Sequence, residues 1–106
     1  MKGAYAMNAS SPPEVGTVVC SRAGRDAGRY FVVLEVLDDQ YVLIADGDLR
    51  KVASPKKKKL KHLDIKMVSI PIVKERMREK SRLFDYDIRQ NLVALGYGPD
   101  KDGQEK

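Results

Sequence analysis

The chain has 106 residues and a mass of 11.9 kDa, enough for one domain with a single modest core. Its 42% hydrophobic and 33% charged residues exclude a collagen-like or fully disordered chain, and no apolar stretch is long enough for a membrane span. The first residues are too polar for a signal peptide. Cys20 is the only cysteine and His62 the only histidine, which excludes a disulfide framework and a zinc cluster. We therefore expect a cytoplasmic protein without a metal or other cofactor.

The charge is unevenly distributed along the chain. Residues 1–49 carry four Lys or Arg against seven Asp or Glu, a net charge of −3, whereas residues 50–106 carry sixteen against eight, a net charge of +8. The densest part, residues 50–62 (RKVASPKKKKLKH), has seven cationic side chains and no acid. This polarity indicates that one region meets a polyanion. The alternative is that the run is only a solvated, solubilising loop.

Short runs of β type begin at Val15 and are separated by turn residues. Val, Ile, Tyr, Phe and Thr dominate these runs, as suits a pleated sheet. The break over residues 22–28 supplies two glycines for positive-φ positions, and Asp46-Gly47 is a strong turn signal. The pattern predicts strands over residues 15–21, 29–37, 41–46 and 48–52, with a fifth over 63–68 after the lysine-rich run.

Consecutive strands joined by tight turns must be antiparallel, and closure into a small barrel removes their exposed edges. The sequence therefore predicts a mainly β protein in which residues 14–70 form a small antiparallel barrel. Residues 1–13 have little periodicity and are expected to form a flexible arm. Residues 71–98 are expected to form a helical extension, and residues 99–106 a frayed tail.

The helical extension has a predicted role in covering the barrel. Residues 30–34 are apolar at every position, so one face would line the barrel interior and the other needs a second layer. We expect a short helix over 73–82, with Met77 as its main apolar contact, and a clearer helix over 85–95. In the second helix an apolar stripe is formed by Ile88, Leu92 and Leu95. Its predicted ends are a cap at Asp85 or Asp87 and a left-handed stop at Gly96.

The segment VGTVVCSRAGRDAGRYFVVLEVL (residues 15–37) resembles the KOW motif of ribosomal proteins and transcription elongation factors. The continuation YVLIADGDLRKVASPKKKKLKHLDI is similar to large-subunit ribosomal proteins of the archaeal and eukaryotic type and to their small bacterial relatives. The resemblance covers residues 15–66 well and the C-terminal helix more loosely. It implies an SH3-like five-stranded barrel that binds nucleic acid, usually ribosomal RNA.

The resemblance also places a set of loop positions near the ligand. These motif positions are Gly16, Arg22, Gly24, Arg25, Asp26, Gly28 and Arg29. The loop glycines would let the backbone approach the RNA closely. Asp26 departs from a purely basic loop: it either holds an arginine in an ion pair or indicates that the loop contacts protein.

The residue types fit RNA binding by backbone and shape. Lysines neutralise phosphates by releasing counterions, and arginine can grip a phosphate in two places. The oriented contacts are expected from Arg22, Arg25 and Arg29, and the less directional ones from Lys51, Lys56, Lys57, Lys58, Lys59 and Lys61. His62 either donates to a phosphate or makes a hydrogen bond within the fold. Aromatic residues are few, which disfavours base-stacking recognition of a single strand.

Other function classes are less well supported by the sequence. No serine, cysteine or acidic pair has the partners of a catalytic site, so we expect neither an enzyme nor a small-molecule substrate. The main alternative is a protein-interaction module of a transcription or translation complex, which would use strand 30–34 and helix 85–95. DNA binding is disfavoured because no helix is a candidate for the major groove.

Overall fold

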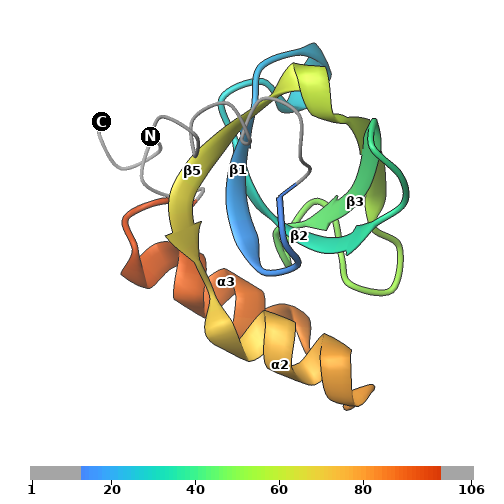
Figure 1. Ribbon diagram of the computed structural model, residues 1–106. Helices are drawn as coiled ribbons and strands as arrows, with labels where there is room; N and C mark the ends of the chain where they lie inside the picture. The colour runs from blue at the N-terminus through green and yellow to red at the C-terminus, as the bar shows by residue number, and fades with distance from the viewer. Residues whose placement is uncertain (1–12, 99–106) are drawn as a thin grey trace.

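The computed structural model describes residues 13–98, and it is drawn in Figure 1. Five strands are followed by two α-helices, and two short 3₁₀ helices lie within the β region. The strands are β1 (Thr17–Ser21), β2 (Tyr30–Val36), β3 (Tyr41–Ala45), β4 (Lys56–Lys59) and β5 (Leu63–Ser69). The helices are η1 (Gly24–Asp26), η2 (Leu60–His62), α2 (Pro71–Glu79) and α3 (Asp85–Ala94). The predicted arm over residues 1–13 and tail over 99–106 fall, apart from residue 13, outside the described residues.

The five strands form one antiparallel sheet in the order β4-β3-β2-β1-β5. Register shifts in the β1–β5 and β2–β3 pairs bend the sheet, as β-bulges do. The sheet curls round on itself, and η2 connects its two outermost strands directly (Figure 1). The predicted fold class, a small barrel-like β fold with C-terminal helices, is confirmed.

Each face of the central strands has its own apolar core. One cluster lies within the curl of the sheet and contains Val19, Phe31, Val33, Val42, Ile44 and Leu63. The other lies between the sheet and the helices and contains Val18, Val32, Leu34, Ala45, Ile70, Val73, Leu83, Ile88 and Leu92. Residues 31–34 alternate between the two clusters and are all buried. The prediction that this strand needs cover on both faces, and that the C-terminal helices supply it, is confirmed.

The fourth predicted strand, over residues 48–52, is wrong. Oδ1 of the buried Asp46 accepts hydrogen bonds from the backbone N–H groups of Asp48 and Arg50, both at 2.9 Å. The carbonyl of Arg50 in turn accepts from the N–H groups of Asp46 and Gly47. These bonds close the chain into a turn, so the segment leaves the sheet. The lysines of residues 56–59 form β4 in its place and pair with β3.

Both helices are present with adjusted ends. α2 begins at Pro71, two residues before the predicted start, and its buried apolar contact is Val73, whereas Met77 is only partly buried. α3 begins at Asp85, and the carboxylate of Asp87 accepts a hydrogen bond from the N–H of Phe84 at 3.0 Å. Gly96 follows the C-cap residue Leu95 and has a φ of 88°, which confirms the predicted left-handed stop.

Candidate nucleic-acid interface

The antiparallel register divides the four lysines of β4 between two faces of the sheet. Lys56 and Lys58 lie opposite Ile44 and Val42, whose side chains belong to the core within the curled sheet. Lys57 lies opposite Leu43, and Lys59 lies opposite Tyr41. Because directly opposed residues share a face, Lys57 and Lys59 lie on the outer face of the barrel, together with Tyr41. The four lysines cannot be told apart in the sequence, but in the fold they lie on two different faces of the strand.

The outer pair of lysines flanks an aromatic ring. The Nζ atoms of Lys57 and Lys59 lie 4.7 Å and 5.6 Å from the centroid of the Tyr41 ring. The preceding turn holds this tyrosine, because Oδ1 of Asp38 accepts hydrogen bonds from the N–H groups of Gln40 and Tyr41, both at 2.8 Å. These two hydrogen bonds, with a smaller contribution from the charge of Lys57, lower the pKa of the Asp38 carboxyl.

On the inner face, Lys58 ties β4 to the loop that carries η1. Its Nζ donates a hydrogen bond to the carbonyl oxygen of Ala23 at 3.1 Å. The predicted glycines of this loop, Gly24 and Gly28, have φ values of 78° and 89°, so both hold the positive-φ positions expected for them. Lys58 is therefore bound to the η1 loop, whereas Lys56, Lys57 and Lys59 form no ion pair with a carboxylate within residues 13–98.

The η1 loop and η2 meet at the end of the barrel away from the helices (Figure 1). The N–H of Arg22 donates to the carbonyl of His62, and its guanidinium donates to the carbonyl of Lys61 at 2.6 Å and lies 3.6 Å from the Asp64 carboxylate. Arg25 and Lys61 are exposed nearby, and neither forms an ion pair within residues 13–98. The side-chain hydrogen bonds that join the η1 loop to β4 and to η2 connect residues 35 and 39 positions apart in the chain. The fold thus gathers basic groups that are distant in the sequence.

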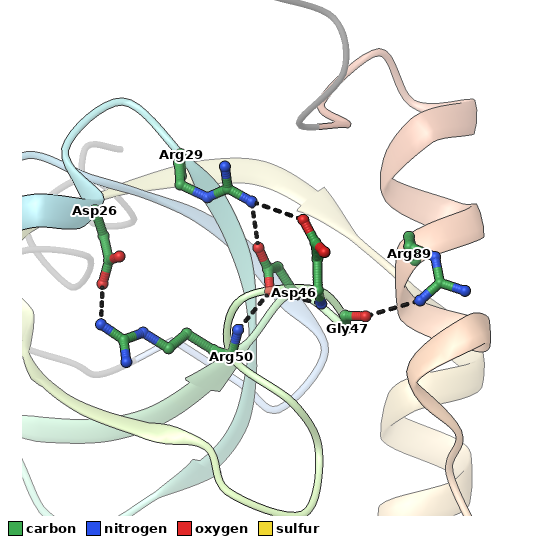
Figure 2. A network of polar contacts seen from close by, with 7 residues as sticks. Asp26, Arg29, Asp46, Gly47, Arg50 and Arg89 are labelled. Carbon is green, nitrogen blue, oxygen red and sulfur yellow. Dashed lines mark hydrogen bonds and ion pairs between the residues drawn. The ribbon is translucent and has the colours of Figure 1, made fainter.

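Arg29 differs from the other loop arginines because a buried carboxylate binds it. Its Nη2 lies 3.0 Å from Oδ2 of Asp46 and 3.3 Å from Oδ2 of Asp48 (Figure 2). Asp46 is 1% exposed, so this ion pair is largely shielded from water. Asp26 is likewise buried and pairs with Arg50 at 3.1 Å. Of the two explanations for Asp26, the structure thus contains the ion pair, although its partner is not one of the three loop arginines.

The same network connects the barrel to α3. Nη1 of Arg89 donates to the carbonyl of Gly47 at 2.8 Å (Figure 2), and Oδ1 of Asp85 accepts from the N–H of Val52 at 2.7 Å. The sequence analysis missed Arg50, Arg89 and the structural role of Asp46. A run of Asp46, Gly47 and Asp48 signals only a local turn, and nothing local indicates partners 17 or 42 residues away.

The remaining predicted positions have less distinctive surroundings. Lys51 is exposed in the turn-rich segment after Arg50, and His62 is half-buried at the end of η2. Gly16 is buried with a φ of 94°, and a Cβ there would approach the carbonyl of Ile70, so its role is to let the chain pass close to α2.

The described residues contain no group of three or more His, Cys, Asp or Glu side chains that could hold a metal ion. Burial raises the pKa of the Cys20 thiol, which disfavours the reactive thiolate. Ser21 is buried and its hydroxyl donates to the carbonyl of Ala23 at 3.1 Å. None of the helices over residues 13–98 has the length and hydropathy needed to cross a bilayer.

Comparisons with known proteins identify a ribosomal relative. No family model matches the chain. The large ribosomal subunit protein eL14 of Desulfurococcus amylolyticus is 32% identical over 59 residues, which are 56% of this chain and 62% of that protein. The chain therefore aligns with less than two thirds of this curated relative. The predicted similarity to large-subunit ribosomal proteins is supported in this form.

Proposed function

We propose that the protein is a non-catalytic RNA-binding module that contacts ribosomal RNA in the cytoplasm, as a ribosomal or ribosome-associated protein. The observation that carries this proposal is the basic end and edge of the barrel. Within residues 13–98, the lysines of residues 51–61 form no ion pair with a carboxylate, whereas Arg29 and Arg50 are each paired with buried acids. Cations without internal partners are the groups that can neutralise phosphates.

The proposal assigns different tasks to the predicted site residues. Electrostatic contacts with phosphates come from Lys51, Lys56, Lys57, Lys59 and Lys61, and directional ones from Arg22, Arg25 and His62. Lys58 and Arg29 position the strand and the loops, because a backbone carbonyl and a buried carboxylate bind their cationic groups. Arg22 also contacts the carbonyl of Lys61 and the carboxylate of Asp64, but its side chain is 53% exposed, so it keeps donors that can face a phosphate. In this proposal residues 14–70 are a KOW-type barrel, and residues 71–98 are the layer that supports it.

The ribosomal relative supports this proposal. It is a protein of the large ribosomal subunit, and its similarity covers 56% of this chain. We therefore favour ribosomal RNA as the RNA that this protein binds.

The proposal is tested by reversing the outer lysines. We expect the double variant Lys57→Glu/Lys59→Glu to bind purified ribosomal RNA more than about tenfold more weakly, and the slope of log affinity against log salt to fall by about 2. The matched control is Arg78→Glu/Lys80→Glu, which makes the same charge change at the end of α2, where both side chains are exposed. Equal losses in the two variants, or RNA binding that does not respond to salt, would contradict a localised phosphate interface.

A second candidate is the protein-interaction role. Phe84, Tyr86 and Val93 are exposed apolar or aromatic side chains on or beside α3, with Tyr86 60% exposed. The other half of the expected protein-binding surface, strand 30–34, is covered by the helices. Docking through α3 would barely respond to salt and would be weakened by Tyr86→Ser but not by Lys57→Glu/Lys59→Glu.

A further inference from the structure

Tyr41 is the aromatic side chain within the proposed interface. Phe31 is fully buried, and the ring of Tyr30 is stacked on that of Tyr97 with centroids 4.2 Å apart. Tyr41 instead carries two ammonium groups over its ring and forms no aromatic pair within residues 13–98. Two other partly exposed rings each have one cation beside them, Lys66 at 5.9 Å from Tyr30 and Arg82 at 4.9 Å from Phe84, whereas Tyr41 has two and lies on the lysine strand's own face.

The backbone on both sides of the ring is held in place before any ligand arrives. Asp38 fixes the N–H groups of Gln40 and Tyr41, and the carbonyl of Gln40 accepts a hydrogen bond from the N–H of Leu60 at 2.8 Å. Tyr41 itself is paired with Lys59 in the sheet. A ring on such a preorganised turn loses little conformational freedom when a ligand stacks on it.

We propose that Tyr41, Lys57 and Lys59 form a binding site for one unpaired nucleotide of an RNA, and this inference rests on the proposed RNA-binding function. The base would stack on the tyrosine ring. The two ammonium groups would move off the ring and bind the phosphates on either side of that nucleotide. Every base has a π face, so this site takes a bulged or looped-out nucleotide without a requirement for one sequence.

This site refines the expectation drawn from the scarcity of aromatic residues. A row of stacked bases requires several exposed rings, and the interface offers one. A base within an intact duplex cannot reach Tyr41, because both of its faces are covered by its neighbours in the stack. A duplex would therefore contact only the cations, whereas a duplex with a bulged nucleotide would contact the cations and the ring.

The test compares two RNA hairpins that differ by one bulged nucleotide. We expect the wild-type protein to bind the bulged hairpin about tenfold more tightly than the fully paired one at equal salt. The preference should disappear in Tyr41→Leu and persist in Tyr41→Phe, because stacking requires the ring and not the hydroxyl. The control variant is Tyr86→Leu, which removes an exposed tyrosine from α3 and should leave the preference unchanged.

A second measurement uses the wild-type protein and so does not depend on the folding of a variant. With 2-aminopurine as the bulged base, stacking on Tyr41 should quench its fluorescence on binding. Tight binding of both hairpins with no preference and no quenching would overturn the nucleotide site while leaving RNA binding intact. Failure to bind either hairpin would overturn the proposed function together with the site.

Discussion

The barrel uses positive charge in two different ways in two regions. Around the turn that follows β3, Arg29 and Arg50 are bound by the buried carboxylates of Asp46 and Asp26, and the resulting network joins three segments of the chain. Along β4, the lysines contact an aromatic ring, a backbone carbonyl or solvent, and no carboxylate pairs with them over residues 13–98. In the first region the positive charges form ion pairs that stabilise the fold. In the second region they remain available to bind a ligand. A count of basic residues in the sequence cannot separate the two.

The largest expected effect lies in the structural region, at Gly47. This residue has a φ of 79°, and a Cβ there would collide with the carbonyl oxygen of Asp85 at the start of α3. We expect Gly47→Ala to lower the free energy of unfolding by about 3 kcal/mol, measured by urea denaturation, since strain and overpacking add. Gly28→Ala is the control: its φ is also positive, at 89°, but nothing lies within 4 Å, so the loss should be about 1 kcal/mol. Equal losses would show that the contact with α3 does not matter.

A smaller effect is expected when the charge of Asp46 is removed. Asp46→Asn keeps an oxygen for the N–H groups of Asp48 and Arg50 but loses the ion pair with Arg29, and we expect a loss of about 2 kcal/mol in unfolding free energy. The RNA affinity of the folded variant should stay within about twofold of the wild type. Asp48→Asn is the comparison, because that carboxylate is half-exposed and its removal should cost less than about 0.5 kcal/mol. A large loss of RNA affinity in Asp46→Asn would contradict the division into a structural region and an RNA-binding region.

Within the lysine strand itself, the two faces should respond differently to neutralisation. Lys58→Gln removes the charged donor to the carbonyl of Ala23, and we expect thermal and urea denaturation to show a loss of about 1 kcal/mol. Lys57→Gln should leave stability almost unchanged while weakening RNA binding and lowering the salt slope by about 1. If the two variants lost the same stability and the same affinity, the assignment of the lysines to two faces would be wrong.

The smallest effect concerns acid and the turn that holds Tyr41. The backbone N–H groups of Gln40 and Tyr41 lower the pKa of Asp38, so the folded state favours the ionised carboxyl. The stabilisation is present above the unfolded pKa of about 4 and is lost as the pH falls through the lower folded value. Asp38→Asn accepts the same hydrogen bonds but does not titrate. The free energy of unfolding, measured as a function of pH below 4, should therefore fall less steeply in this variant than in the wild type. Identical pH profiles would show that the turn does not depend on the charge.

The sequence predicts the strands that have β-forming side chains and misses the one that does not. β1, β2, β3 and β5 are rich in Val, Ile and aromatic residues, so local composition is sufficient to find them. β4 consists of four lysines, which have low strand propensity, and it is a strand because it pairs with β3 in register. Conversely, residues 48–52 follow the Asp46-Gly47 turn signal, which predicts a hairpin, but hydrogen bonds to the side chain of Asp46 fold this segment into a turn outside the sheet.

The local features of the candidate site can be predicted from the sequence, but its long-range contacts cannot. The lysine run and the glycine positions of the η1 loop can be found from the sequence, because they depend on composition and local turn chemistry. The separation of Lys57 from Lys58 depends on the register with β3. The capture of Arg29 depends on a carboxylate 17 residues later. Both are long-range properties of the folded chain, and a local pattern does not encode them.

β4 is hydrogen-bonded on one side only, to β3, and lies at the end of the strand order. A strand in that position offers a row of backbone donors and acceptors to any other extended chain, which is a route to aggregation. If two copies approached through β4, the lysines of both strands would come together, and their like charges would repel. The side chains that we propose attract a polyanion would thus also keep the protein monodisperse, and their neutralisation would threaten solubility as well as binding.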